Sequence, residues 1–227
     1  MTQLWFTADL HIGHGNIAVA RGFESAEEHD AELARRWDSA VRPRDEVWVL
    51  GDISMNGKRN VERALQWISE RPGTKHLVAG NHDSCHPMHS RAHKWQRVYL
   101  EVFETVQQSA VRKVRGHRVL LSHFPYAHGI NADHTTEVRY PEWRFPDRGQ
   151  FIIHGHTHST YTSWDRQIHV GVDARGFAPV SLNWIEDFVD NYKPLPNTVE
   201  YICPPGSPTL IFNSAVFDVQ TRTNTAQ

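Results

Sequence analysis

The apolar residues fall into short runs separated by amphipathic stretches. Residues 47–50 are four large apolar side chains in sequence, which is typical of a strand buried on both faces of a parallel sheet. The segments 4–8 and 75–79 predict two further strands. Between them, helical spacing predicts one helix that starts at the capping box Ser25-Ala26-Glu27-Glu28 and another around residues 61–68. This β-α-β-α-β order predicts parallel pairing with right-handed crossovers.

The second half of the chain predicts hairpins and short strands. The turn signals are Gly116-His117 in the first hairpin and Asp165-Arg166 in the second. Five prolines between residues 194 and 208 then break any regular pattern. We therefore predict an α/β domain over residues 1–190 and a Pro-rich extension over 191–227 whose last residues are flexible. The predicted strands of this half are 111–115, 118–122, 151–153, 161–164, 167–170 and 180–182, with one more within 209–219.

Polar residues follow the predicted strands at the points where they end. Because the carboxyl ends of parallel strands meet at one edge of a sheet, and ligands of open α/β sheets bind there, we expect these side chains to converge. Asp9 and His11 are two residues apart on an extended segment, so both point the same way and could share one cation. The residues at the strand ends are Asp9, His11, Asp52, Asn81, His82, Asp83, His123, His154 and His156.

Composition narrows the picture. The chain has 227 residues with 16 histidines, a formal net charge of -2 and 22% charged residues, so no global basic field favours nucleic acid. Only Cys85 and Cys203 occur, which fits a reducing compartment. No apolar run approaches the roughly 18 residues of a membrane span, and Met1 leads directly into the first strand. We therefore expect a cytoplasmic protein with no membrane association.

The motifs Asp-x-His, Gly-Asp, Gly-Asn-His-Asp, Ser-His and His-Gly-His, in this order over most of residues 4–182, resemble those of the calcineurin-like metallophosphoesterase family. The resemblance implies a four-layer αββα sandwich, with mixed sheets flanked by helices and two metal ions at the strand ends. It implies His82 as the acid and Asp83 as its orienting partner. The implied ligands are Asp9, His11 and His156 for the first ion, Asn81, His123 and His154 for the second, and Asp52 as the bridge.

These assignments predict a definite chemistry. A carboxylate that bridges two cations roughly 3.5 to 4 Å apart lets them clamp a phosphoryl group and generate a bridging hydroxide for in-line attack on phosphorus. His82 would protonate the leaving oxygen, an effect typically worth about 10² to 10⁴ in rate. Nitrogen, amide and carboxylate ligands without thiolate suit Mn, Fe, Zn or Ni. We expect two divalent ions and favour Mn for both.

The loop 126–149 lies between two ligand-bearing strands and carries the substrate candidates. Arginine forks match phosphate oxygens, so Arg139 and Arg144 are expected to bind substrate, whereas the neighbouring aromatic residues either stack on a base or only pack the loop. His14 and His158 each either touch substrate or make a structural hydrogen bond. We predict hydrolysis of small phosphate esters, diesters before monoesters, with small or cyclic nucleotides as the favoured substrates.

Three alternatives stay open. A nuclease acting on DNA or RNA would need a positive groove, which the net charge of -2 does not favour, so we expect no stable nucleic-acid complex. A non-catalytic binding scaffold on the same fold would lose active residues, whereas here His82 and every implied ligand are present. An esterase for acyl or sulfuryl substrates is disfavoured because Asn81 beside His82 resembles the phosphoesterase pattern specifically. Cys85 is expected to fill space, and His86, His89 and His93 to lie on a solvated helical face. An oligomer is compatible with the sequence.

Overall fold

The computed structural model of the chain describes residues 2–127, 138–194, 198–200, 210–213 and 220–221. The chain divides into two compact units, residues 1–191 and 192–227. The first unit holds every residue of the predicted site. In the second, β11, β12 and β13 form an antiparallel sheet in that order. The bounds of these strands are Thr198–Glu200, Leu210–Asn213 and Gln220–Thr221.

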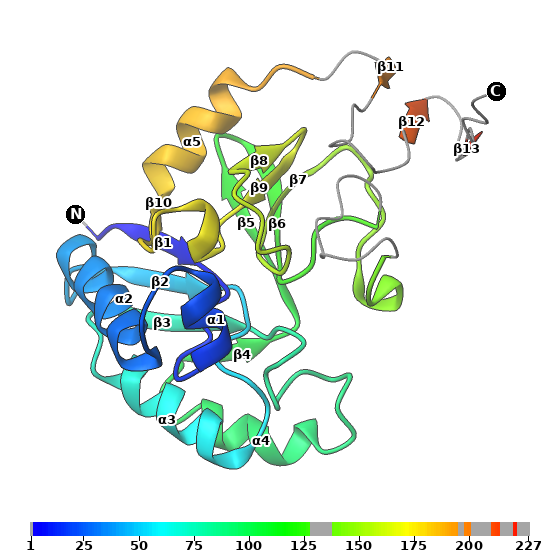
Figure 1. Cartoon of the computed structure of the whole chain (residues 1–227). Coiled ribbons are helices and arrows are strands. Elements are labelled where there is room, and N and C mark those ends of the chain that lie inside the picture. The colour runs from blue at the N-terminus through cyan, green and yellow to red at the C-terminus, as the bar shows by residue number, and fades with distance from the viewer. Residues whose placement is uncertain (1, 128–137, 195–197, 201–209, 214–219, 222–227) are drawn as a thin grey trace. The chain divides into compact units, whose positions relative to one another are not determined.

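The first sheet of unit 1 has the order β10-β1-β2-β3-β4 (Figure 1). Strands β1 to β4 run parallel to one another, and β10 pairs with β1 in the antiparallel sense. This confirms the parallel pairing predicted for the first three strands. The bounds are Leu4–Thr7 for β1, Glu46–Val49 for β2, Thr74–Val78 for β3, Thr105–Gln107 for β4 and Val180–Ser181 for β10.

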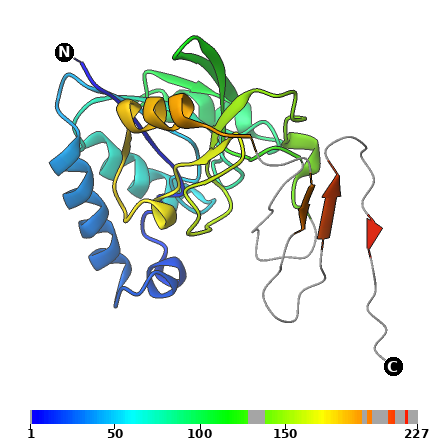
Figure 2. The same cartoon turned by 90° about the horizontal axis from the view of Figure 1, so that it is seen from above.

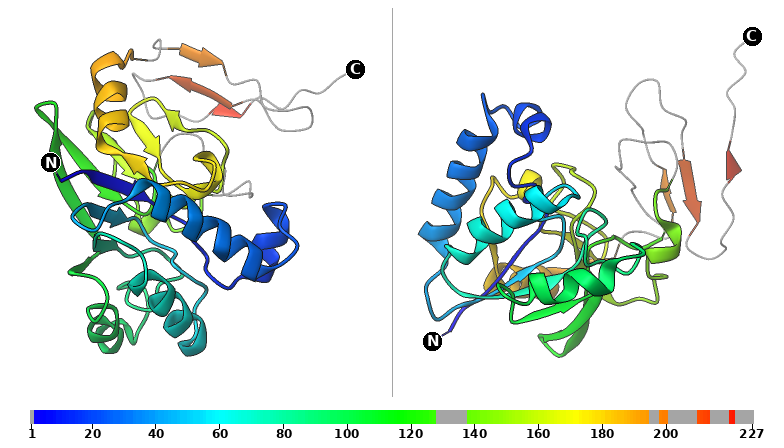
Figure 3. Two further views of the ribbon diagram at one scale, coloured as in Figure 1. Left: turned by 90° about the vertical axis from the view of Figure 1, so that its left-hand side faces the viewer. Right: turned by 90° about the horizontal axis from the view of Figure 1, so that it is seen from below.

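Helices α2 (Ala26–Ala40) and α3 (Lys58–Ser69) cover one face of this sheet, as seen in Figure 3. The predicted capping box begins α2, because the Ser25 hydroxyl accepts a hydrogen bond from the backbone N–H of Glu28 at 3.1 Å. Trp37 of α2 is buried, and its indole N–H donates to the carbonyl of Pro72 at 3.0 Å. The apolar residues predicted at 61–68 all face this core.

The second sheet has the order β5-β6-β7-β9-β8, with β6, β7 and β9 parallel. Its first hairpin turns one residue earlier than predicted, at Arg115 and Gly116, which have φ of 46° and 83°. Positive φ at both positions gives the turn the twist that a two-residue hairpin requires. The strand bounds are Ser109–Val114, His117–Ser122, Phe151–His154, Ser163–Trp164 and Gln167–His169 for β5 to β9.

Three helices were not predicted as such. Helix α1 (Gly15–Ala20) follows the first site motif, and α5 (Leu182–Asn191) packs beside β10 and β5 (Figure 2). Helix α4 (Ala92–Tyr99) begins after His86 and His89, and His86 is buried. The expected solvated helical face of histidines is therefore wrong for His86. Short 3-10 helices occupy 141–143 and 172–174.

The result is the layered α/β fold that the sequence predicted, with two mixed sheets and helices on the outside. Among the described elements, α5 is the helix that packs beside the second sheet, so the helical layer on that side is thin. In the part of the chain that the structure describes, no helix has the length and hydrophobicity needed to cross a bilayer.

Candidate metal centre

The predicted site lies where the carboxyl ends of both sheets meet. Beyond their strands, β1 and β2 continue to pair through backbone hydrogen bonds from Asp9 to Gly51 and from His11 to Asp52, both 3.0 Å. The loop after β7 joins them, since the backbone N–H of His156 donates to both carboxylate oxygens of Asp9 at 3.0 and 2.9 Å. Backbone bonding therefore sets the positions of side chains that are far apart in sequence.

His123, at the end of β6, ties the second sheet to the first. Its Nδ1 lies 2.8 Å from the carbonyl of Leu50, and a carbonyl only accepts, so Nδ1 carries the hydrogen. Nε2 then points to Asn81 Oδ1 at 3.0 Å and Asp52 Oδ2 at 3.4 Å. In the neutral ring this nitrogen carries the lone pair that a metal ion needs.

Two groups of described residues bring ligand atoms within 4.8 Å of one another. They are Asp9, His11 and His158 on one side, and Asp52, His123 and His156 on the other. Asp52 lies between them, with Oδ2 at 3.9 Å from His11 Nε2. The structure thus brings together Asp9, His11, Asp52, Asn81, His123 and His156 of the predicted set, and adds His158.

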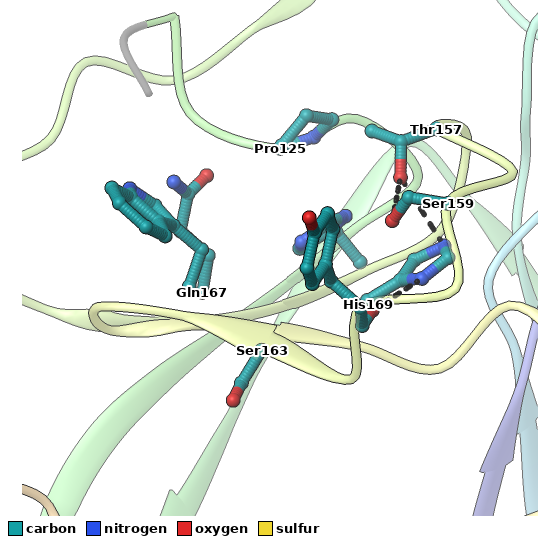
Figure 4. Close-up of a pocket in the computed structure, with 9 residues that line it drawn as sticks. Pro125, Thr157, Ser159, Ser163, Gln167 and His169 are labelled. Carbon is teal, nitrogen blue, oxygen red and sulfur yellow. Dashed lines mark hydrogen bonds between the residues drawn. The ribbon is translucent and has the colours of Figure 1, made fainter. Parts of the chain in front are cut away.

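His154 is the predicted ligand that the geometry does not support. Its ring stacks on His169 with centroids 5.2 Å apart, and its Nδ1 donates to the carbonyl of Gly155 at 2.8 Å. It lines a small cavity of about 20 Å³ with Thr157 and Gln167 (Figure 4). His156 and His158 have the same spacing as His154 and His156, and it is this later pair that lies among the other donor groups.

The donor atoms fit divalent ions. Ligands on one ion with bonds of about 2.0 to 2.2 Å lie about 3 to 3.5 Å apart. Two pairs of nitrogens have this separation: His11 Nε2 and His158 Nε2 at 3.2 Å, and His123 Nε2 and His156 Nδ1 at 3.2 Å. A cation between each pair of facing imidazole nitrogens would be bound by both nitrogens and by the buried carboxylates beside them.

The buried carboxylates and imidazoles of the site shift one another's pKa values. Burial raises the pKa of Asp9 to about 6, against the lowering effect of His158 and His123. For Asp52, burial opposes ionisation, but His123 outweighs it and holds the pKa well below its usual range. Burial likewise lowers the pKa of His11, which keeps that imidazole neutral and able to bind a metal.

The backbone of the site is strained. Five of its non-glycine residues have positive φ, a conformation that costs of order 1–3 kcal/mol each and clusters at functional sites. Two motif glycines allow close approach: a Cβ on Gly80 would collide with the Asp52 carboxylate, and one on Gly155 would lie 2.6 Å from Asp9 Oδ2. The φ values are 60° at Asp9, 49° at His11, 53° at Asp52, 74° at His156 and 50° at His158.

His82 and Asp83 lie beside the metal-binding groups but do different things. His82 is half-buried, its ring centroid is 5.6 Å from that of His11, and burial lowers its pKa. Asp83 is fully buried, and its carboxylate accepts hydrogen bonds from the backbone N–H groups of Gly80, Asp52 and Ile53 at 2.7, 2.9 and 3.1 Å. Asp83 therefore joins the ends of β2 and β3 and does not orient the His82 ring in this structure.

A groove of about 480 Å³ opens beside His82. One wall is Trp143, whose ring packs edge-on against the buried His86 with centroids 4.9 Å apart. His89 also lines the groove, and its Nε2–H donates to the carbonyl of Asn81 at 3.0 Å. Its lining residues are Asn56, Asn81, His82, Met88, His89, Tyr140, Glu142 and Trp143.

The predicted substrate residues His14, Arg139 and Arg144 are not among the residues that line this groove, and each makes a different contact. Arg139 lies over the Tyr140 ring at 5.0 Å and donates to its hydroxyl at 2.8 Å. Arg144 is buried, and its Nε–H donates to the carbonyl of Arg139 at 2.9 Å, so it supports the loop. His14 accepts a hydrogen bond from the N–H of Ile17 and caps α1. Of the two roles considered for His14, this is the structural hydrogen bond. Residues 128–137 of the predicted loop lie outside the described residues.

Comparison with known proteins agrees with this geometry. The family model for the calcineurin-like phosphoesterase superfamily domain matches residues 3–172. The chain belongs to this superfamily, and membership implies divalent metal ions and the hydrolysis of phosphate esters.

The relatives include two phage proteins. The chain is 48% identical over 203 residues to the Gene 66 protein of Mycobacterium phage L5, covering 84% of this chain and 96% of that protein. It is 46% identical over 184 residues to the Gene 66 protein of Mycobacterium phage D29, covering 77% and 89%. A crystal structure of AQ665, a protein of unknown function from Aquifex aeolicus, has a TM-score of 0.63 at 23% identity, covering 83% of this chain and 100% of that chain. It shows the fold alone.

Proposed function

We propose that the protein is a two-metal phosphodiesterase for small phosphate esters, and that small or cyclic nucleotides are its substrates. The observation that carries the proposal is the convergence of oxygen and nitrogen donors on both sides of Asp52, directly beside His82 and the groove. Asp9, His11 and His158 would hold one ion, and Asn81, His123 and His156 the other, with Asp52 shared. This replaces His154 with His158 in the set expected from the sequence.

Two divalent ions there would supply Lewis-acid polarisation of the phosphoryl oxygens and a water of low pKa, and we favour Mn. The residues of the chain do the rest. Asp52 keeps both cationic positions close enough to act on one phosphoryl group. His82, at the edge of the groove, donates a proton to the leaving oxygen as the bond to phosphorus breaks.

The groove favours an aromatic leaving group over a further phosphate. Among the described residues that line it, Glu142 is the one charged side chain, and Trp143 and Met88 supply apolar contact. A base that stacks on an aromatic ring gains roughly 1–3 kcal/mol. A nucleoside ester places such a base on the leaving oxygen beside His82, whereas an ester of a small alcohol leaves the groove empty.

The test is hydrolysis by metal-stripped protein with Mn, Fe, Zn, Ni or Mg added back. We expect bis-p-nitrophenyl phosphate to be cleaved faster than p-nitrophenyl phosphate, and activity to disappear in Asp52→Asn. Glu32→Gln, in a surface ion pair with Arg35 and Arg36 on α2, is the control. Absence of hydrolysis with every metal, in protein that binds two ions, would refute the catalytic proposal and leave a binding scaffold.

The nucleotide preference is tested separately. Trp143→Ala should raise KM for 2',3'-cyclic nucleotides by about 5- to 150-fold, because a lost stacking contact of roughly 1–3 kcal/mol corresponds to that range. Trp184→Ala is the matched control, since Trp184 lies on α5 and does not line the groove. Equal KM values for the two variants would exclude Trp143 from substrate binding. Faster hydrolysis of long DNA or RNA would favour the nuclease alternative.

A further inference from the structure

An aspartate and an arginine form an ion pair directly behind His158. Asp173, in the 3-10 helix that follows β9, accepts a hydrogen bond from His158 Nδ1 at 2.9 Å. Arg21, at the end of α1, donates two hydrogen bonds to the same carboxylate, from Nε to Oδ1 at 2.8 Å and from NH2 to Oδ2 at 2.7 Å. The Arg21 side chain is 4% exposed and that of Asp173 14%. Residues from three separate segments, of which that of Arg21 is far from the other two in sequence, therefore form one chain of hydrogen bonds.

These hydrogen bonds determine which nitrogen of His158 faces the metal centre. An ionised carboxylate only accepts, so the bond to Asp173 requires the hydrogen on Nδ1. In the neutral ring Nε2 then carries the lone pair, and Nε2 is the atom that lies 3.2 Å from His11 Nε2. A carboxylate behind a histidine fixes the tautomer and orientation of metal-binding imidazoles in general.

Arg21 holds the carboxylate in place and cannot be replaced by a simple charge. Besides gripping Asp173, it donates to the backbone carbonyl of Asp9 at 2.8 Å and contacts His29 Nε2 at 2.9 Å. It thus fixes Asp173 relative to the end of β1, where Asp9 and His11 lie. A planar fork with several donors makes these bonds at once, whereas a lysine ammonium does not.

His158 needs such support more than His11 does. Its side chain is 21% exposed, against 2% for His11, and its backbone has φ of 50°. An exposed side chain on a strained turn has other rotamers available. The bond to Asp173 restricts it to the one that points toward Asp9 and His11.

We propose that Asp173, held by Arg21, is a positioning residue that fixes His158 as a nitrogen ligand of the first ion. The inference rests on the proposed function in assigning an ion to Asp9, His11 and His158. It adds two residues to the working centre that neither the motifs nor the ligand groups include.

The experiment is a calorimetric titration of metal-free protein with Mn²⁺, with electron paramagnetic resonance to follow the coupling between the two ions. Asp173→Asn keeps the shape, but its amide group must face one of the N–H groups that the carboxylate accepts. We expect the affinity of one of the two sites to fall about 10- to 100-fold while the other is unchanged. Coupled signals should be replaced by those of isolated Mn²⁺. Arg21→Lys should weaken the same site.

A double-mutant cycle separates positioning from general damage. In a His158→Ala background, adding Asp173→Asn should change Mn²⁺ binding by less than about 2-fold, because the residue acts through His158. Asp45→Asn is the matched control, since Asp45 is also a buried, hydrogen-bonded carboxylate but precedes β2 at the opposite end of the sheet. It should bind two ions like the wild type.

Three results would overturn the proposal: wild-type Mn²⁺ binding in Asp173→Asn, equal weakening of both sites, or a full loss that persists in the His158→Ala background. If the wild-type protein itself binds no pair of ions and hydrolyses no ester, the proposed function fails as well. If the wild type binds two ions and Asp173→Asn binds them equally well, only the positioning role fails.

Discussion

Asp83 offers the sharpest test of how the site is built. Its carboxylate is fully buried and accepts three backbone N–H groups, from Gly80, Asp52 and Ile53, which join two strand ends at the metal centre. Replacing Asp83 with Ala leaves all three donors buried without this acceptor. Each unsatisfied donor costs about 1–3 kcal/mol, so the sum is about 3–9 kcal/mol. With partial relaxation we expect a loss near 5 kcal/mol.

That loss would be large for a domain of ordinary stability, about 5–15 kcal/mol. Asp83→Asn should lose less, about 2–3 kcal/mol, because the amide oxygen still accepts at one position while its NH2 group faces a donor at the other. The assay is urea unfolding followed by tryptophan fluorescence in the presence of a chelator. Asp187→Ala, an exposed substitution on α5, is the control and should stay within about 0.5 kcal/mol.

The same variants decide between two roles for Asp83. The alternative is that Asp83 joins no strands and instead orients His82, as the sequence motif suggested. In that case the free energy of unfolding of Asp83→Ala would lie within about 1 kcal/mol of the wild-type value, while kcat would fall by about 10²-fold or more. That combination would refute the structural role. A large loss of stability, with kcat of the folded Asn variant changed less than about 10-fold, would support it.

Three further predictions concern the acid, the ions and pH. His82→Gln should lower kcat about 10²- to 10⁴-fold for diesters with alkyl leaving groups but much less for p-nitrophenyl esters, which need no proton; equal losses on both would remove the acid role. Chelation should lower the melting temperature, because an ion at 100 times its Kd adds about 2.7 kcal/mol to the stability; an unchanged melting temperature would contradict bound ions. Burial opposes ionisation of Asp45, but hydrogen bonds from Gln3 and Arg42 outweigh it and lower its pKa. Its stabilisation is therefore complete above the unfolded pKa of about 3.9 and lost as pH falls through the lower folded value, so Asp45→Asn should flatten the acid limb of unfolding curves measured at stepped pH.

Much of the fold could be predicted from the sequence, because local patterns carry it. The unbroken apolar run of β2, the Ser25 capping box and the apolar spacing of α3 each specify an element through contacts close in the chain. Helix α5 was missed because it continues directly from β10: the strand ends at Ser181, and the Ser181 hydroxyl itself caps the helix by accepting a hydrogen bond from the backbone N–H of Trp184 at 3.3 Å. The hairpin turn at Arg115 was misplaced by one residue because Gly116 serves equally well as the first or second residue of a turn.

The sequence by itself determined which chemistry the protein carries: aspartates, histidines and one asparagine at the ends of parallel strands, which must share an edge of a sheet. Only the tertiary structure decided which histidines face the centre. His154, His156 and His158 alternate with the same spacing, and the choice depends on the backbone bond from His156 to Asp9 in the other sheet. Asp173 and Arg21 carry no local pattern at all, since their meeting behind His158 depends on three separate segments folding together. Spacing along the chain is a local property, whereas the direction of a side chain at a site between two sheets is set by hydrogen bonds made after the sheets pack.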